Sequence, residues 1–383
     1  MPTCMHKARS QTKYTPHETR KRSSSMASSS GATSSVFALI LFTCCLALLA
    51  ASSAAAAAAG GGVDDEVDAG GDKLMMGRFL RWQAAYNRSY PTAEERERRF
   101  QVYRRNMEHI EATNRAGNLT YTLGENQFAD LTEEEFLGLY TMKGMPSGRG
   151  GVRRDAGRKQ ANISAVDGPT SVDWRSKGAV TPIKNQGPSC SSCWAFVTAA
   201  TIESITKIKT GKLVSLSEQE LIDCDPYDGG CNLGYFVNGY RWVIENGGLT
   251  TEANYPYQAR RNYCSRNKAA QRAAQISDYV QVPAGEAQLQ QAVAQQPVAA
   301  AIEMGGSLQF YSGGVFSGQC GTRMNHAITV VGYGADANTG LKYWLVKNSW
   351  GTSWGERGYL RMHRDATRSG LCGIALDLAY PVV

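Results

Sequence analysis

The cysteines of this 383-residue chain are the feature that most limits what it can fold into. Three of the ten, Cys4, Cys44 and Cys45, lie in an N-terminal segment that ends in a run of alanines. The other seven follow that segment: Cys190, Cys193, Cys224, Cys231, Cys264, Cys320 and Cys372. In an oxidising compartment six would pair and one would remain, and a thiol spared from pairing needs burial or a chemical role. We therefore expect a disulfide-stapled fold with one functional cysteine.

Residues 36–59 indicate the compartment. Residues 36–50 (VFALILFTCCLALLA) are apolar, and the small residues from Ala51 to Ala59 offer several A-x-A cleavage sites, which is typical of a secretory signal peptide. A transmembrane anchor is the alternative, but about 20 apolar residues are needed to span a bilayer and this core is shorter. We interpret residues 1–59 as an N-terminal extension and signal peptide, with translation starting at Met1 or Met26, and expect no stable membrane anchor.

The remaining chain divides at two stretches that lack apolar periodicity. Residues 60–71 are rich in Gly, Asp and Glu, and residues 143–167 begin with the Gly- and Arg-rich run KGMPSGRGGVRRDAGRKQ. Such stretches are typical of exposed, protease-sensitive linkers. We therefore predict two folded units, at residues 72–142 and 168–383, joined by the linker at 143–167.

The first unit is predicted to be a helical hairpin. Residues 73–114 have a helical pattern that is broken at Tyr90 and Pro91. In the second helix, seven residues recur at spacings of three and four and so share one face: Glu95, Arg99, Val102, Tyr103, Asn106, Ile110 and Asn114. Spacing alone indicates no more than an amphipathic helix.

The second unit changes character along its length. Residues 193–209 (CWAFVTAATIESITKIK) carry apolar residues at helical spacing, with lysines near the end and Gly211 beyond, which predicts a buried central helix. The last third contains short β-rich runs between glycine-rich turns, among them PVAAAIEM, HAITVVGYG and GYLRMHR. We therefore expect an α+β fold in which a helical half precedes a sheet or barrel half.

Charge and cysteine spacing argue against two classes of function. The net charge of +7 is spread over several regions, and no folded part is basic enough to indicate nucleic-acid binding. A cysteine metal site is disfavoured, because the pair Cys190 and Cys193 is matched neither by a second C-x2-C pair nor by spaced histidines. We expect no metal and no cofactor.

Cys193 is the strongest candidate for chemistry, because it starts the predicted central helix. Unsatisfied N–H groups and the helix dipole at that end stabilise an anion and lower the pKa of a thiol, which favours a nucleophilic thiolate. Such a nucleophile needs a base and a third group to orient the base. His326 heads the apolar run HAITVVGYG and Asn348 lies in KNSWGTSWG, whereas His363 has no motif around it and is interpreted as a surface residue.

Several segments together resemble the papain family of cysteine proteases, of the cathepsin L or plant papain type. NQGPSCSSCWAF, MNHAITVVGYG and YWLVKNSWGTSWGERGY are similar to the three active-site signatures of that family, within residues 168–383. Upstream, the helical face described above resembles the ERFNIN motif of the family's propeptide, with Tyr103 in place of Phe. Its G-x-N-x-F-x-D motif is matched by Gly124, Asn126, Phe128 and Asp130. Five motifs in the family's order are very unlikely to match by chance.

The resemblance implies a papain-like two-domain fold, with a helical left domain and a β-barrel-like right domain, preceded by a helical inhibitory propeptide. It implies a cysteine endopeptidase made as a zymogen, which hydrolyses peptide bonds through a thioester acyl-enzyme. Cys193 would be the nucleophile, His326 would pair with it and protonate the leaving amine, and Asn348 would orient the imidazole. Trp350 resembles the tryptophan that shields the His to Asn hydrogen bond from water, a role compatible with ordinary core packing.

Gln186 resembles the glutamine that forms the family's oxyanion hole together with the Cys193 backbone N–H. The sequence departs from the family here, because seven steps separate Gln186 from Cys193 where the usual pattern has six. Ser191 also replaces a usual glycine. Loops absorb one-residue insertions well, so we expect a bulge near Pro188 and Ser189 that leaves both ends in place.

The resemblance also implies the cysteine pairing. It joins Cys190 to Cys231, Cys224 to Cys264, and Cys320 to Cys372, and it leaves Cys193 free. N-x-Ser/Thr sequons indicate where glycans would be attached: Asn87, Asn118 and Asn162. All three precede the second unit, so glycans are expected on the N-terminal part or at the boundary.

By the same resemblance, Gly234 lies where the substrate backbone pairs with the enzyme, next to Leu233, which replaces a second usual glycine. The pocket for the side chain two residues before the cut would be apolar or aromatic in preference, with four residues on its wall: Tyr235, Phe236, Ala301 and Ala327. Asp377 would lie at its base, where a carboxylate either pairs with Arg or Lys of the substrate or turns to solvent.

The expected biology follows from these assignments. The propeptide would block the cleft until acidification protonates carboxylates and cleavage between Ala156 and Gly168 frees a monomeric enzyme, in the vacuole, a lysosome-like compartment or outside the cell. Expected partners are protein and peptide substrates, the enzyme's own propeptide and cystatin-type inhibitors. Two other functions remain open: a protease-shaped storage or binding protein without turnover, and an amine-accepting transferase or peptide ligase.

Overall fold

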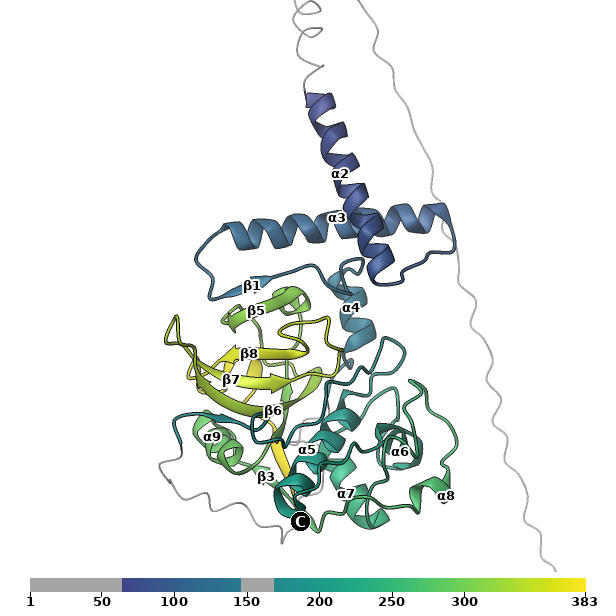
Figure 1. The fold of residues 1–383 in the computed structure, drawn as a ribbon, viewed down its shortest axis with the longest axis vertical. Coiled ribbons are helices and arrows are strands. Elements are labelled where there is room, and N and C mark those ends of the chain that lie inside the picture. Colours follow the sequence, from purple (N-terminus) through teal and green to yellow (C-terminus); the bar gives the residue numbers. More distant parts are fainter. Residues whose placement is uncertain (1–63, 146–168) are drawn as a thin grey trace, which may run out of the picture. The chain divides into compact units, whose positions relative to one another are not determined.

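The computed structural model describes residues 64–145 and 169–383 (Figure 1). The expected signal peptide, most of the expected linker at 143–167 and the Asn162 sequon lie outside the described residues. The chain divides into two compact units, residues 1–71 and 72–383, and only the opening turns of helix α2 are described in the first unit. Within the described ranges, no helix combines the length and the apolar character that a membrane span requires.

The N-terminal part of the described chain contains three helices and one short strand: α2 (Asp64–Ala85), α3 (Ala93–Arg115), β1 (Tyr121–Leu123) and α4 (Glu133–Tyr140). The helical hairpin predicted from the break at Tyr90 and Pro91 is confirmed. Helix α2, however, begins at Asp64, inside the segment expected to be a linker, rather than at Lys73. The acidic run there explains the earlier start, because carboxylates are favoured at a helix N-terminus.

The face of α3 that carries the residues at helical spacing holds the hairpin together. Tyr103 packs between Phe79 and Trp82 of α2, with ring centroids 5.1 and 5.4 Å away. Asn106 donates hydrogen bonds of 2.8 and 2.9 Å to the backbone carbonyls of Ala129 and Leu131. These contacts fix the chain that leads from α3 into α4, so the seven residues at helical spacing do more than form an amphipathic stripe.

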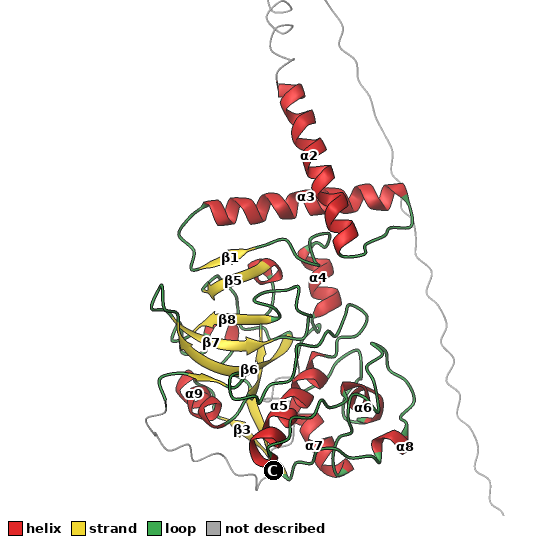
Figure 2. Ribbon diagram, in the orientation of Figure 1, coloured by secondary structure: helices red, strands yellow, loops and turns green. Residues whose placement is uncertain are grey.

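A central buried helix organises the next part of the chain, with short helices around it: α5 (Cys193–Thr210), α6 (Glu218–Cys224), α7 (Phe236–Asn246) and α8 (Arg266–Ala269). The predicted helix from Cys193 is confirmed, and it ends at Gly211, which adopts the left-handed conformation with φ of 76°. Residues 193–206 are all buried. Figure 2 shows α6, α7 and α8 gathered to one side of the strands, which agrees with the predicted helical half.

The C-terminal part is dominated by strands: β2 (Val172–Asp173), β3 (Asp278–Val282), β4 (Val298–Ile302), β5 (Tyr311–Phe316), β6 (His326–Ala335), β7 (Lys342–Lys347), β8 (Tyr359–His363) and β9 (Leu378–Val382). Helix α9 (Glu286–Gln295) and two 3₁₀ turns, η1 (Gly306–Phe310) and η2 (Leu371–Gly373), lie between them in sequence. The strand order is β1-β5-β8-β7-β6-β4-β9-β3, and β2 pairs with β6. Helix α5 packs against β6, so the helical half meets the sheet at the start of that long strand.

Strand β1 joins the N-terminal part of the described chain to this sheet. It pairs antiparallel with β5, and the register places Tyr121 opposite Gly314. A side chain at Gly314 would meet the backbone of Thr120 at 2.5 Å, so the absence of a side chain allows the close approach. The N-terminal part is therefore attached to the rest by added sheet as well as by side-chain packing.

Candidate active site

The first turn of α5 and the first residues of β6 meet at a fully buried point. Cys193 and His326 both have 0% exposed surface. The backbone N–H of Ala327, the residue after His326, donates to Cys193 Sγ at 3.5 Å. Cys193 is the free cysteine among the described residues. The two residues that are 133 positions apart in the sequence are therefore brought together by the packing of α5 on β6.

Asn348 and Trp350 complete the surroundings of the imidazole. His326 Nε2 and Asn348 Oδ1 are hydrogen bonded at 2.8 Å. The Trp350 ring lies over the imidazole, with centroids 4.6 Å apart, and is itself fully buried. His326 Nδ1 is buried and has no hydrogen-bond partner within the described ranges. Asn348 thus fixes one ring nitrogen and leaves the other for chemistry.

Burial favours the neutral form of both groups in this structure. Desolvation raises the pKa of the Cys193 thiol to about 12, against the opposing effect of backbone N–H groups from Ala327 and Trp194. Desolvation also lowers the pKa of His326 to about 4, although its hydrogen bond with Asn348 acts in the other direction. The predicted low thiol pKa is therefore wrong for the covered chain, because removal of water outweighs the helix N-terminus.

The chain leaving α4 crosses in front of this point. Its Met142 and Met145 are 2% and 9% exposed and belong to the same buried cluster as Cys193. Their backbone N–H groups donate to the carbonyls of Asn325 and Met324, at 2.8 and 2.9 Å. The segment predicted to open an exposed linker at 143 is exposed at Lys143 and Gly144, but Met145 returns to a buried site.

Gln186 lies beside the same crossing chain. Its Oε1 accepts from the Ser349 hydroxyl at 2.7 Å, which turns its Nε2 toward the carbonyl of Tyr140, 3.3 Å away. Its own backbone is held by Ser349 and by Tyr257, whose hydroxyl donates to the Gln186 carbonyl at 2.7 Å. A propeptide carbonyl thus occupies the amide donor that was predicted to hold an oxyanion.

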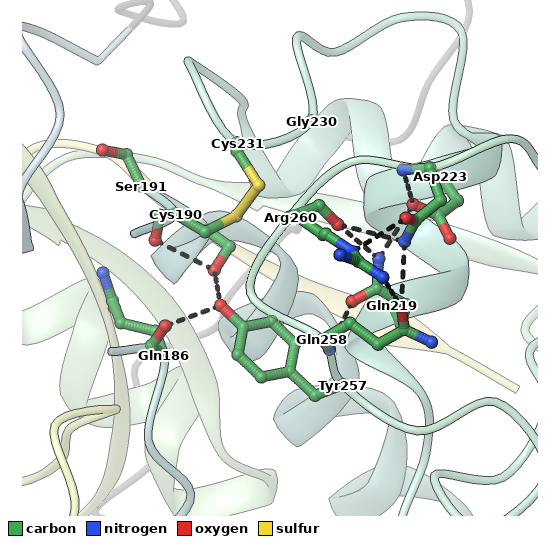
Figure 3. Close-up of a disulfide and its surroundings, with 12 residues drawn as sticks. Gln186, Cys190, Ser191, Gln219, Asp223, Gly230, Cys231, Tyr257, Gln258 and Arg260 are labelled. Atoms are coloured by element: carbon green, nitrogen blue, oxygen red, sulfur yellow. Dashed lines mark hydrogen bonds between the residues drawn. A yellow bond between two sulfur atoms is a disulfide. The ribbon is translucent and has the colours of Figure 1, made fainter. Parts of the chain in front are cut away.

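Figure 3 shows Tyr257 beside Gln186, next to the disulfide between Cys190 and Cys231. Tyr257 also hydrogen bonds the Ser192 hydroxyl at 2.9 Å, so one phenol ties both ends of the loop that includes the extra residue. Tyr257 lies in NYPYQ, where no periodicity or motif used above marked it, so sequence reasoning missed it. Pro188 and Ser189 are exposed, as expected for a bulge.

The structure contains three disulfides: Cys190–Cys231, Cys224–Cys264 and Cys320–Cys372. The first lies next to the active-site helix and fixes the loop before Cys193 to the loop before Gly234. Within the part of the chain that the structure describes, no cluster of three or more potential metal ligands occurs. Asn87 and Asn118 are both exposed, so these two sequons are open to modification.

The residues predicted to line the substrate pocket are close to the dyad. Tyr235, Phe236, Ala301 and Ala327 are buried in one cluster with Cys193. A side chain at Gly234 would lie 2.3 Å from the Trp194 ring, so only glycine lets this backbone approach α5. Leu233, beside it, is 39% exposed on the rim.

Asp377 does not turn to solvent. It is half-buried, and its carboxylate accepts a 2.6 Å hydrogen bond from the Tyr235 hydroxyl. Burial and the neighbouring carboxylate raise the pKa of Tyr235, so the phenol remains a donor. The carboxylate is thereby held against a residue of the predicted pocket.

Behind Asn348 lies a buried ion network that the sequence did not indicate. Lys184 Nζ contacts Glu203 at 3.1 Å and Glu218 at 2.6 Å, and both carboxylates are about 1% exposed. Lys347 donates to the carbonyl of Thr181 at 3.0 Å. A cavity of about 20 Å³ lies among these groups, next to Asn348. The network supports the strand end that carries Asn348, because each charge is paired or hydrogen bonded.

Comparison with known proteins agrees with this geometry. Residues 168–382 match the family model described as papain family cysteine protease, and residues 79–136 match the cathepsin propeptide inhibitor domain. A senescence-specific cysteine protease, SAG39, from Oryza sativa subsp. japonica is 49% identical over 316 residues, 81% of this chain and 91% of the relative. Fruit bromelain from Ananas comosus is 48% identical over 313 residues, 81% of this chain and 87% of its own.

Two solved proenzymes have similar structures. Recombinant stem bromelain precursor has a TM-score of 0.73 at 44% identity, covering 81% of this chain and 99% of its own. The proform of the ragweed pollen cysteine protease Amb a 11 has a TM-score of 0.73 at 39% identity, covering 81% of this chain and 94% of its own. The chain therefore belongs to the papain family of cysteine proteases and carries a cathepsin-type inhibitory propeptide before its peptidase domain, so the predicted family, fold and zymogen are confirmed.

Proposed function

We propose that Cys193, His326 and Asn348 carry out the peptide hydrolysis of this cysteine endopeptidase. The observation that supports this most is the meeting of the α5 N-terminus with the His326–Asn348 pair at one buried point. Once the propeptide has left, water reaches the pair and the desolvation that keeps it neutral is relieved. The thiol proton then passes to His326 Nδ1, and the thiolate is stabilised by the helix N-terminus.

The reaction follows from these positions. Cys193 Sγ attacks the scissile carbonyl carbon, and the resulting oxyanion is held by Gln186 Nε2 and the Cys193 backbone N–H. The C–N bond breaks as His326 gives its proton to the leaving amine, which produces a thioester. Water then attacks the thioester carbonyl carbon while His326 takes a proton from it. The C–S bond breaks, the carboxylic acid product leaves, and Cys193 is regenerated as a thiolate beside the protonated His326.

Covalent labelling of the matured enzyme tests this assignment. The similar Carica candamarcensis cysteine protease has been solved in complex with E-64, at a TM-score of 0.53 and 43% identity, covering 56% of this chain and 98% of its own. An epoxide of this kind should alkylate Cys193 alone, and peptide mapping by mass spectrometry would identify the site. An unlabelled Cys193 in folded, matured protein would favour a storage or binding protein without turnover.

The propeptide is proposed to inhibit by occupying the groups that a substrate needs. Its Tyr140 carbonyl takes the Gln186 amide, and its two methionines fill the cluster around Cys193. A groove of about 830 Å³ lies between α4 with the chain that follows it and the loop at 319–325. Cleavage between Ala156 and Gly168 would release the block.

Asp377 is proposed to add a preference for basic residues two positions before the cut. Replacing Asp377 by alanine should lower kcat/KM for peptides with Arg at that position by about tenfold, since a charge-assisted hydrogen bond is lost, while peptides with Leu change little. The Tyr235→Phe variant is the matched control, because it removes the hydrogen bond from the Tyr235 hydroxyl and keeps the carboxylate, so it should retain or raise kcat/KM for the peptides with Arg at that position. Unchanged Arg cleavage in the alanine variant would exclude a role for this carboxylate.

The pH dependence of stability is expected to favour mildly acidic conditions. Desolvation raises the pKa of Asp225 to about 8, with the charge of Asp228 as a second cause, and raises that of Asp228 to about 6 and that of Glu220 to about 7. Above about pH 4, these three carboxyl groups bind more protons in the folded chain than in the unfolded chain. Their contribution to the unfolding free energy therefore falls as pH rises toward 8.

Thermal unfolding of the inactive Cys193→Ala proenzyme between pH 6.5 and 8.5 measures this effect, in a range that avoids the His326 titration. The melting temperature should fall by a few degrees across that range, as expected for about 1 to 2 kcal/mol. In the Cys193→Ala protein that also carries Asp225→Asn, the fall in melting temperature should be smaller, because the carboxyl group of residue 225 has been removed and no longer titrates. Parallel curves for the two proteins would show that the pair does not contribute.

An acidic vacuole or lysosome-like compartment, or secretion, is proposed as the destination, and the pH trend above supports it. Protein and peptide substrates, cystatin-type inhibitors and a monomeric state are proposed by resemblance. The amine-accepting alternative uses the same thioester, so product analysis with an added amine nucleophile distinguishes transfer from hydrolysis. A dominant hydrolysis product at moderate amine concentration is expected.

A further inference from the structure

The small cavity beside Asn348 has the size of one water molecule. Its volume is about 20 Å³, and a cavity needs at least about 10 to 15 Å³ of this kind to hold a water. Three deeply buried polar side chains lie on its wall: Glu218, Lys347 and Asn348, which are 1%, 7% and 3% exposed. Cavities that stay dry have apolar walls, so these polar groups favour a bound water.

The amide of Asn348 has a donor that needs an acceptor. Its Oδ1 is hydrogen bonded to His326 Nε2 and accepts from the Ser349 backbone N–H, both at 2.8 Å. Because a backbone N–H can only donate, the second contact identifies this end of the amide as the oxygen. Nδ2 lies at the other end, is buried, and has no hydrogen-bond partner among the described residues. Such a donor is unfavourable unless something accepts from it.

Glu218 has an acceptor that needs a donor, on the wall of the same cavity. Its Oε1 accepts from Lys184 Nζ at 2.6 Å, whereas Oε2 is buried and makes no hydrogen bond within the described ranges. Desolvation raises the pKa of Glu218 to about 8, against the attraction of Lys184. A water suits both forms of this group, because it can donate to a carboxylate oxygen or accept from a carboxyl hydroxyl. Two incomplete polar groups thus share one water-sized space.

We infer that the cavity binds one ordered water molecule, which accepts from Asn348 Nδ2 and links it to Glu218 Oε2. Glu218 is thereby a positioning residue that acts on His326 through the water and the Asn348 amide. With Nδ2 held at the cavity, Oδ1 stays on His326 Nε2, which keeps the proton of the neutral ring there and leaves Nδ1 to take the thiol proton. The effect on catalysis rests on the proposed function, whereas the water site does not.

A high-resolution crystal structure of the Cys193→Ala proenzyme tests the water site. We expect one density peak in the cavity, within about 2.7 to 3.2 Å of both Asn348 Nδ2 and Glu218 Oε2. The measurement uses the full chain and needs no turnover. A cavity without a peak, or a peak that does not reach both atoms, would overturn the inference.

The positioning role is tested by comparing Glu218→Gln with Glu218→Met in the matured enzyme. Both replacements are similar to Glu in length and both remove the charge beside Lys184, so they differ in whether they can hydrogen bond the water. Relative to the Gln variant, the Met variant should lower kcat about fivefold with little change in KM, as expected for one net hydrogen bond. The alkaline limb of its kcat/KM profile should lie about 0.7 pH unit lower, because a weaker Asn348 contact lowers the pKa of the imidazolium by the same factor.

The outcomes separate this inference from the proposed function. If the wild type hydrolyses a fluorogenic peptide and the Gln and Met variants share one pH profile, the positioning role is excluded and the peptidase assignment stands. A role of Glu218 in the ion network alone would weaken both variants equally, which also excludes the inference. If the folded, matured wild type is inactive, the proposed function fails and the positioning role fails with it. The crystal density decides the water site separately, even if Glu218→Met does not fold.

Discussion

Replacing Cys193 by alanine is expected to lower kcat/KM by about 10⁶, the loss typical of removing a nucleophile that acts as one unit with its base. Cys193 is the free cysteine among the described residues, and its sulfur accepts from the amide of Ala327, which directly follows His326. Hydrolysis of a fluorogenic peptide by the matured protein measures the loss. The proenzyme should also stop processing itself, which gel electrophoresis at acidic pH would detect.

The alanine variant should keep its fold, because it removes one sulfur atom from a packed site and no disulfide. The matched control is Ser189→Ala, an exposed change in the same loop, which should retain nearly full activity. Maturation of the alanine variant needs an added protease, so residual cleavage must be corrected for that protease. Activity within tenfold of the wild type after this correction would contradict the assignment of the nucleophile.

Cys193 and His326 could be selected from the sequence because the patterns that mark them are local. A helix that begins at Cys193 needs only the apolar spacing that follows and Gly211 at its end, and both are visible in the chain. His326 was chosen over His363 by the apolar run behind it, and the structure buries His326 fully while His363 remains partly exposed on β8. Local patterns therefore pointed to both residues, and folding brings the Cys193 sulfur to the amide of Ala327 beside His326.

The protonation state of Cys193 could not be predicted from the sequence, because it depends on contacts between distant segments. The sequence places Cys193 at a helix N-terminus, and that feature alone lowers a thiol pKa. Complete burial of Cys193, in a cluster that includes Met142, raises the pKa of the thiol instead. Burial by a segment about 50 residues upstream has no local signature, so helix position could predict the reactive group but not its latent form.

The attachment of the propeptide to the sheet was missed for a similar reason. Strand β1 spans three residues, Tyr121–Leu123, too few to show an alternating pattern, and its partner β5 is far along the chain. The buried carboxyls at Asp225 and Asp228 were also missed, since Asp in a turn is ordinarily solvated. Local sequence patterns do not predict strand pairing or burial when these depend on residues far away in the chain.

The extra residue before Cys193 shows how a departure from a family pattern can be absorbed. A shift of Gln186 along the chain would have moved its amide away from the reacting carbonyl. Instead its backbone N–H and its side chain are both bonded to Ser349, which directly follows Asn348. The position of Gln186 is thus fixed by the strand end that carries Asn348 rather than by its own loop. The inserted residue can therefore bulge outward without moving Gln186.

Replacing Gln186 by alanine is accordingly expected to lower kcat by about 10² to 10³ with a much smaller change in KM, because the lost donor acts on the oxyanion rather than on bound substrate. Steady-state kinetics of the matured variant measure both parameters. Ser349→Ala should reduce kcat less, since it leaves the donor but removes the 2.7 Å hydrogen bond that aims it. Gln127→Ala is the matched control: that glutamine contacts the peptidase domain from the propeptide and leaves with it. A kcat for Gln186→Ala within threefold of the wild type would mean that the insertion has displaced this amide from the oxyanion and that another group holds the charge.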